Sequence, residues 1–243
     1  MLELSNTRSR IIDAAMRLAA SHGWSGLSLD RIATEAGTSL AELRKEFSSK
    51  IEILAAYTRA VDDAVLAKIG PAEASLATRD RLFDVLMTRF ELMAPHKAGL
   101  ARIRRDLRGR FGESVAQFGV TARSLYWMLQ AAGIDAEGAR GFLRIPGLMG
   151  IYARVFGIWL EDDDPGLART MAALDSRLRR GERAMQRIDD FNAAAARFCS
   201  SILPFRTDRA GGAPPQGDAE PVTPEPEVHS SNGSAGPGPA PAL

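Results

Sequence analysis

The stretch AGTSLAELRKEFSSK, residues 36–50, places a glycine-containing turn directly before a short amphipathic helix. The hydroxyl of Ser39 can cap that helix, because N-cap side chains accept hydrogen bonds from free N–H groups of the first turn. The apolar positions recur at three- and four-residue spacing, which predicts one buried face: Leu40, Leu43 and Phe47. The remaining positions carry charges of both signs: Glu42, Arg44, Lys45 and Glu46.

Helical periodicity continues on both sides of this stretch. Residues 7–23 predict a first helix that ends at Gly23, and residues 28–37 predict a second, with Ser28 as its cap and Gly37 as its stop. A long helix is predicted from Ser48 or Ser49 to Gly70. Two short helices joined by a tight turn give the geometry of a helix-turn-helix.

Further helices are predicted after Pro71, and no segment alternates with a two-residue period, so we expect an all-α fold. The predicted helices cover residues 78–96, 97–109, 113–132, 136–160, 165–189 and 190–203. Residues 207–243 contain eight prolines and six glycines with almost no large apolar side chains. Such a segment cannot offset its ordering entropy, so a disordered tail is predicted.

Composition narrows the class of protein. A chain of 243 residues that is 45% hydrophobic can bury a substantial core. No apolar run approaches the ~20 residues of a membrane span, no export signal is evident at the N-terminus, and the single cysteine, Cys199, fits a reducing compartment. We therefore expect a cytoplasmic protein. Residues 1–67 hold 8 Lys/Arg against 9 Asp/Glu, which argues against tight nucleic-acid binding by that part alone.

The first 65 or so residues resemble the N-terminal domain of the TetR family of transcriptional regulators. The resemblance is carried by RIIDAAMRLAASHGW, LSLDRIATEAGTS and FSSKIEILAAY. It implies a homodimer, a two-fold-symmetric DNA operator, and a helical C-terminal domain with a pocket for a small molecule. It also implies that ligand binding changes the separation of the paired recognition helices.

The recognition helix departs from the family pattern at positions 40, 42, 44 and 46. Glu42 allows two interpretations, acceptance of a hydrogen bond from a cytosine amino group or local pairing with a base such as Lys45. Serines at positions 28 and 39 allow phosphate contact or simple capping. The DNA-binding residues predicted from the resemblance and from local charge are Ser28, Thr38, Ser39, Glu42, Arg44, Lys45 and Lys50.

A second resemblance covers about 45 residues, from Phe142 to Met185. This segment is similar to the accessory lipid-binding protein of ubiquinone biosynthesis, which has the TetR architecture without its function as a DNA-binding repressor. It implies an alternative function, the binding of a lipid or isoprenoid without sequence-specific DNA binding.

Methionines and aromatic side chains of the C-terminal region suit an adaptable apolar pocket. Its predicted ligand-binding residues are Phe90, Met93, His96, Leu125, Met128, Met149, Tyr152 and Phe156. The arginines of residues 102–110 allow a solvated helix face or the binding of an anionic group. The histidines lack the spacing of metal ligands, and no nucleophile or phosphate-loop motif occurs, so neither catalysis, a metal nor a cofactor is expected.

These observations predict three parts: a helix-turn-helix DNA-binding domain (1–67), a helical ligand-binding and dimerisation domain (68–206), and a disordered tail (207–243). The predicted function is a dimeric, TetR-type repressor that binds double-stranded DNA. An apolar or amphipathic small molecule is expected to release it, and membrane contact is not expected.

Overall fold

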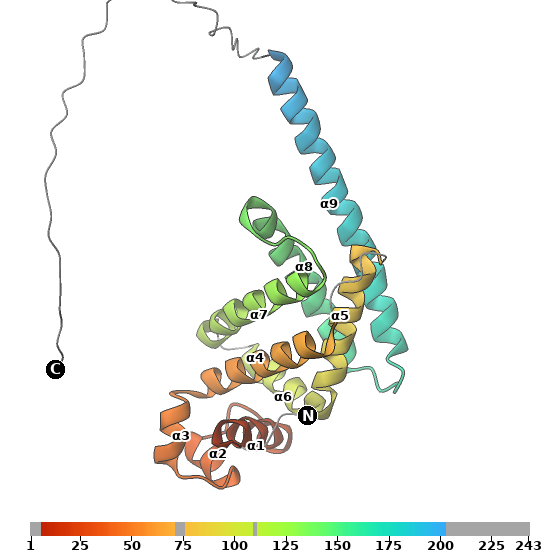
Figure 1. Cartoon of the computed structure of the whole chain (residues 1–243). Coiled ribbons are helices and arrows are strands. Elements are labelled where there is room, and N and C mark those ends of the chain that lie inside the picture. Colours follow the sequence, from red (N-terminus) through yellow and green to blue (C-terminus); the bar gives the residue numbers. More distant parts are fainter. Residues whose placement is uncertain (1–5, 71–75, 109–110, 203–243) are drawn as a thin grey trace, which may run out of the picture. The chain divides into compact units, whose positions relative to one another are not determined.

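The computed structural model describes residues 6–70, 76–108 and 111–202, which form helices and contain no strand (Figure 1). The predicted all-α fold is confirmed. Chain contacts join residues up to Ala195 into one compact unit. The elements are α1 (Thr7–His22), α2 (Leu29–Glu35), α3 (Leu40–Glu46), α4 (Lys50–Lys68), α5 (Thr78–Met93), the 3-10 turn η1 (Ala94–His96), α6 (Lys97–Leu107), α7 (Phe111–Ala131), α8 (Gly138–Leu160) and α9 (Ala168–Ile202).

The helix-turn-helix is formed by α2 and α3, and local hydrogen bonds fix both of its helix starts. The Ser28 hydroxyl oxygen accepts from the N–H of Arg31 at 3.2 Å, and that of Ser39 accepts from the N–H of Glu42 at 3.1 Å. Gly37 in the turn has φ of +64°, a conformation that glycine adopts without a Cβ penalty. Both predicted caps are therefore confirmed.

The apolar stripes of α1, α2 and α3 meet in one core. Its largest members are fully buried: Ile11, Trp24, Ile32, Leu43 and Phe47. Leu40, which the periodicity placed on the buried face, is instead 47% exposed. Leu40 is the first residue of a helix of only seven residues, and it lies one turn from the exposed Arg44, so it belongs to the outward side of α3.

Helix α6 packs along α1 and joins the helix-turn-helix to the remaining helices. The contact is close at Gly99, where an added Cβ would lie 2.6 Å from the carbonyl oxygen of Met16. That separation is below any real Cβ contact, so a side chain at position 99 would push α1 and α6 apart. Glycine is thus required at this position by packing rather than by backbone conformation.

Helices α4, α5, α7 and α8 pack around a second apolar region. Four rings from α5 and α8 form a closed cluster, with centroid distances of 5.4 to 5.7 Å between neighbours: Phe90, Tyr152, Phe156 and Trp159. Such offset contacts each contribute about 0.5–1.5 kcal/mol beyond their buried area. This aromatic cluster fixes α8 against α5.

Helix α8 has more apolar surface than the other helices of the chain bury. Residues Gly141–Leu160 are long and apolar enough for a membrane span by length and composition, although only 28% of that window is buried. The prediction that no apolar run approaches the length of a membrane span was therefore wrong. Arg144 and Arg154 interrupt the run, but its mean hydropathy is still that of a possible membrane span. A core helix of a globular protein passes the same test of length and composition. Pro146 lies inside α8, within the helix predicted over residues 136–160.

Helix α9 is continuous from Ala168 to Ile202, whereas the sequence predicted two helices that met near residue 190. The correction has a local cause. Between Gly181 and Ile202 the chain has no glycine or proline, and the alanines at 193–196 favour the helical state most strongly. The predicted tail, residues 207–243, lies outside the described residues.

Replacement of Gly99 by alanine tests the contact between α1 and α6. We expect Gly99→Ala to lower the free energy of unfolding by about 1–3 kcal/mol, the usual cost of overpacking. The matched control is Gly119→Ala in α7, where an added Cβ meets no atom within 4 Å. Helix propensity predicts that this control gains up to ~1 kcal/mol. Urea denaturation at fixed protein concentration measures both, and equal effects of the two variants would contradict the close contact.

Candidate functional site

The outward side of α3 presents two cations. The side chains of Arg44 and Lys45 are exposed, and neither side chain forms a hydrogen bond or an ion pair with another residue that the structure describes. The exposed Leu40 lies one helical turn before Arg44. Unpaired cations beside an apolar side chain suit a nucleic-acid groove, because phosphates attract the cations and thymine methyl groups accept apolar contact.

The carboxylate of Glu42 is used inside the protein. It accepts hydrogen bonds from the Thr38 hydroxyl at 2.6 Å, from the Ser39 N–H at 3.1 Å and from the Ser39 hydroxyl at 3.3 Å. With the reciprocal bond from the Glu42 N–H, Ser39 and Glu42 form a capping box. The bond from Thr38, followed by those from Ser39, holds the pKa of the Glu42 carboxyl below its ordinary value. Of the two interpretations of Glu42, the geometry favours a local one, with the capping box in place of a Lys45 ion pair.

The carboxylate of Glu46 points back to α1. A guanidinium nitrogen of Arg8 lies 3.3 Å from the Glu46 carboxylate and also donates to the Glu46 carbonyl at 3.2 Å. The same guanidinium lies over the ring of Phe47, 4.4 Å from its centroid. Arg8 was not identified from the sequence, because its partners are 38 residues away. Both acids of α3 are thus engaged within the fold, Glu42 as a hydrogen-bonded carboxylate that keeps its charge and Glu46 as the ion-pair partner of Arg8.

The other predicted DNA contacts are hydroxyls at helix starts and one lysine. Ser28 and Ser39 are exposed while they cap α2 and α3, so capping and phosphate contact are compatible. Lys50 is half-buried. Its ammonium donates to the carbonyl of Trp24 at 2.9 Å and lies 5.5 Å from the Trp24 ring centroid.

The loop between α1 and α2 is held from α6 as well. The carboxylate of Asp106 accepts from the N–H of Trp24 at 2.7 Å and from the N–H of Ser25 at 2.9 Å. These bonds, that of Ser25 first, keep the pKa of the Asp106 carboxyl below its ordinary value. Asp106 was missed by the sequence analysis because no local signal links it to residues 81 and 82 positions earlier.

A cavity of about 420 Å³ opens between α4, α5, α6, α7 and α8. Its walls are mostly apolar, and arginine, glutamine, threonine and tyrosine side chains add polar groups. The lining residues are Leu54, Tyr57, Thr58, Arg89, Met93, Leu100, Ile103, Arg104, Leu107, Arg108, Gln117, Phe118, Thr121, Met149, Tyr152, Ala153 and Phe156. Its size and composition are those of a small-molecule site.

Half of the predicted ligand-binding residues line this cavity: Met93, Met149, Tyr152 and Phe156. Three others are buried in the core and do not line it: Phe90, Leu125 and Met128. His96 also lies outside the lining set. Its ring meets that of Tyr57 edge-on at 5.3 Å, and its Nε2 lies 3.5 Å from the carboxylate of Asp13 in α1. The structure therefore places His96 at the contact between α1 and the second group of helices.

A buried polar network forms one wall of the cavity. The Arg89 guanidinium donates to the carboxylate of Asp62 and, at 3.2 Å, to the hydroxyl of Tyr152. The Ser124 hydroxyl donates to the same Asp62 oxygen at 2.7 Å. Arg89 is 3% and Asp62 6% exposed, and charges this deeply buried must be paired. The network joins α4, α5, α7 and α8.

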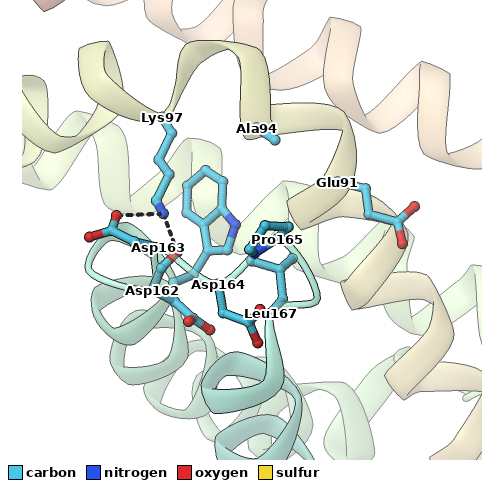
Figure 2. A pocket seen from close by; sticks show the side chains of 9 residues that line it. Glu91, Ala94, Lys97, Asp162, Asp163, Asp164, Pro165 and Leu167 are labelled. Atoms are coloured by element: carbon cyan, nitrogen blue, oxygen red, sulfur yellow. Dashed lines mark hydrogen bonds and ion pairs between the residues drawn. The ribbon is translucent and has the colours of Figure 1, made fainter.

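A second hollow lies beside the turn between α8 and α9 (Figure 2). Lys97 extends toward this turn, and its ammonium donates to the carbonyl of Asp162 at 2.5 Å and lies 3.9 Å from the carboxylate of Asp163. The Asp162 carboxylate accepts from the hydroxyl and N–H of Thr170, and Asp164 accepts from the N–H of Ala168. The described part of the chain has no group of three or more potential metal ligands. These side chains hold the turn and the start of α9.

Comparisons with known proteins agree with this architecture. Residues 11–57 match the family model described as bacterial regulatory proteins, tetR family. The TetR transcriptional regulator from Nitrosomonas europaea ATCC 19718 is 22% identical, with a TM-score of 0.59 over 72% of this chain and 97% of that chain. A TetR transcriptional regulator from Rhodococcus sp. RHA1 is 19% identical, with a TM-score of 0.55 over 72% and 95%. No curated protein matches the chain.

A third structure, a tetR-family transcriptional regulator from Streptomyces coelicolor, is 16% identical and has a TM-score of 0.51 over 83% of this chain and 93% of that chain. At these identities the structures establish the fold, and the match over residues 11–57 covers the helix-turn-helix. The helix-turn-helix segment therefore matches the tetR family of bacterial regulatory proteins, and the described residues share the fold of TetR transcriptional regulators.

Proposed function

We propose that the chain is a cytoplasmic, dimeric repressor whose α3 helices bind a two-fold-symmetric DNA operator. The observation that carries this proposal is that both α3 acids are engaged within the fold, Glu42 by hydrogen bonds of the capping box and Glu46 by the ion pair with Arg8. Arg44 and Lys45 then remain as the charges that meet phosphate or base edges. The near-neutral charge of the surrounding domain predicts binding of modest strength with a steep salt dependence.

The proposed dimer uses α8 and α9. Phe142 is 80% exposed, and Leu143 and Met171 are also exposed apolar side chains on these helices. Added Cβ atoms at Gly147 and Gly150 would meet nothing within 4 Å, so this side of α8 is open to a second copy. In a two-fold dimer the paired α3 helices would bind half-sites one helical turn of DNA apart, about 34–36 Å, or a multiple of it.

The proposed signal is an apolar or amphipathic molecule in the cavity. Helix α6 contributes Leu100, Ile103 and Leu107 to the cavity wall and Asp106 to the α1–α2 loop. A rigid helix with both contacts transmits a shift at the cavity to the helix-turn-helix. A ligand that favours the shifted position of α6 would therefore release DNA by population shift.

Removal of the two outward cations tests the DNA-binding face. We expect Arg44→Ala plus Lys45→Ala to weaken binding to fragments selected from genomic DNA. The log–log salt slope should fall by about 0.9 for each phosphate that the variant no longer neutralises. Fluorescence anisotropy across a salt series measures both quantities. The matched control, Arg102→Ala plus Arg105→Ala on the exposed side of α6, should bind as the unmodified protein does. Selection that yields no two-fold-symmetric motif would refute the proposal and favour the lipid-binding alternative.

Substitution of Glu42 by glutamine separates its two possible roles. Glutamine can still support a capping box but lacks the negative charge. We expect Glu42→Gln to fold normally and to bind DNA of any sequence more tightly, with its sequence preference unchanged. Competition binding against operators altered at each C·G pair makes the measurement. Relaxed discrimination at one such pair would instead show that the carboxylate reads a cytosine.

Asp106→Ala tests the connection between α6 and the α1–α2 loop. We expect the amides of Trp24 and Ser25 to exchange with solvent about tenfold faster or more, because a charge-assisted hydrogen bond is removed. In the unmodified protein the pKa of the Asp106 carboxyl lies below its ordinary value. The carboxylate, and with it the protection of the two amides, therefore persists as the pH falls through the ordinary carboxyl pKa. The protection is lost only when the pH falls through the lowered pKa of Asp106. Amide exchange followed by NMR measures both effects, with Asp63→Ala, an exposed acid of α4, as the control.

A further inference from the structure

The cavity carries a pair of cations where it opens to solvent. Arg104 is half-buried and Arg108 is exposed, and both belong to the lining set. They lie one helical turn apart and therefore on the same side of the α6 region. Within the described ranges neither guanidinium group forms a hydrogen bond or an ion pair. An arginine pair with this arrangement offers several N–H donors to one anion.

The guanidinium of Arg104 is held in position. It lies 5.8 Å from the ring centroid of Phe156, and an added Cβ at Gly157 would lie 2.6 Å from one of its nitrogens. The glycine of α8 therefore makes room for this cation. Burial and then the like charge of Arg108 lower the pKa of Arg104, and Glu161 offsets part of that effect. An anion bound between the arginines would relieve their repulsion.

A second polar feature lies deeper in the cavity. Tyr57 is 2% exposed, and its buried hydroxyl has no hydrogen-bond partner among the described residues; the same is true of the Gln117 side-chain oxygen. Burying an unpaired polar group costs about 1–3 kcal/mol. A ligand that carries an oxygen atom at this depth would supply the missing partner of the Tyr57 hydroxyl.

The positions of the two features along α6 indicate the length of the ligand. The ring of Tyr57 packs on that of His96, directly before α6, and Arg104 and Arg108 follow His96 by two to three turns of helix. At a rise of 1.5 Å per residue the backbone separation of His96 from the two arginines is about 12–18 Å, comparable to a medium alkyl chain. Most of the remaining lining is apolar and suits an alkyl chain: Leu54, Met93, Leu100, Ile103, Leu107 and Met149.

We propose that the cavity binds a single-chain amphiphile whose anionic headgroup, a carboxylate or a phosphate, lies between Arg104 and Arg108. Its chain extends toward Tyr57, whose hydroxyl bonds to an oxygen on the chain. The idea rests on the proposed function, because it names the chemical class of the molecule that would release DNA.

Titration calorimetry on the full-length protein tests the headgroup. The probes are decanoate and decyl phosphate, each below its micelle concentration, and uncharged decanol below its solubility limit. We expect at least one of the two anions to bind more tightly than decanol. Arg104→Gln plus Arg108→Gln should weaken the anion about tenfold or more, as expected when a charge-assisted hydrogen bond is removed, and leave decanol unchanged. The preferred anion identifies the headgroup.

The matched control removes the same charge from the other side of α6. Arg102→Gln plus Arg105→Gln should leave all three affinities unchanged. Equal binding of decanol and both anions by the unmodified protein would overturn the proposal. So would equal effects of the two double variants, since general charge would then account for the binding.

Tyr57→Phe tests the inner end with one oxygen atom removed. The unmodified protein should bind 10-hydroxydecanoate more tightly than decanoate, and Tyr57→Phe should abolish that difference. Preference for decanoate by both proteins would refute the role of the hydroxyl. The selection of DNA fragments is a separate measurement. DNA binding without amphiphile binding would refute this inference alone. Amphiphile binding without DNA binding would refute the proposed function alone.

Discussion

The buried ion pair of Arg89 and Asp62 is the constraint around which the second group of helices is organised. Two charges removed from water need excellent geometry and additional hydrogen bonds, and Ser124 and Tyr152 supply those bonds. The four side chains come from α4, α5, α7 and α8, so a shift of α4 or α5 would separate the two buried charges, and a shift of α7 or α8 would remove one of their hydrogen bonds. Removal of one partner from such a pair typically costs about 3–5 kcal/mol. The rigid wall leaves α6 as the side of the cavity that the network does not hold.

Helix α6 has a different kind of attachment. Gly99 brings it close to the backbone of α1, and Asp106 holds the loop at Trp24 and Ser25 through exposed or partly buried hydrogen bonds. Its inner side lines the cavity. One helix thus contacts the candidate ligand and the candidate DNA-binding unit, while the opposite wall is fixed. This asymmetry is what a ligand-responsive switch requires, because a bound molecule changes the position of the element that is least constrained.

Most of the fold follows from local signals in the sequence. The caps depend on hydrogen bonds between residues three positions apart, at Ser28 and Ser39, and the turn depends on the backbone conformation of Gly37. These local features, like the helical class, were therefore predicted correctly. The two acids of α3 show where local reasoning ended. Glu42 finds its partners within four residues and its capping box was encoded by the spacing of Ser39 and Glu42. Glu46 is paired by Arg8, and only the packing of α1 against α3 reveals that.

The sequence by itself determined the helices, the helix-turn-helix and the supply of apolar side chains for a cavity. Only the tertiary structure decided which of these side chains line it. Met93 of α5 and Met149 of α8 line the cavity, whereas Leu125 and Met128 of α7 are in the core. Helix α7 lines the cavity with residues nearer its start instead: Gln117, Phe118 and Thr121. The tertiary structure also placed Arg104 and Arg108, out of the five arginines at residues 102–110, at the cavity. It brought Asp62 to Arg89 and Asp106 to Trp24. Helix–helix packing sets these long-range pairs, and no spacing along the chain encodes it.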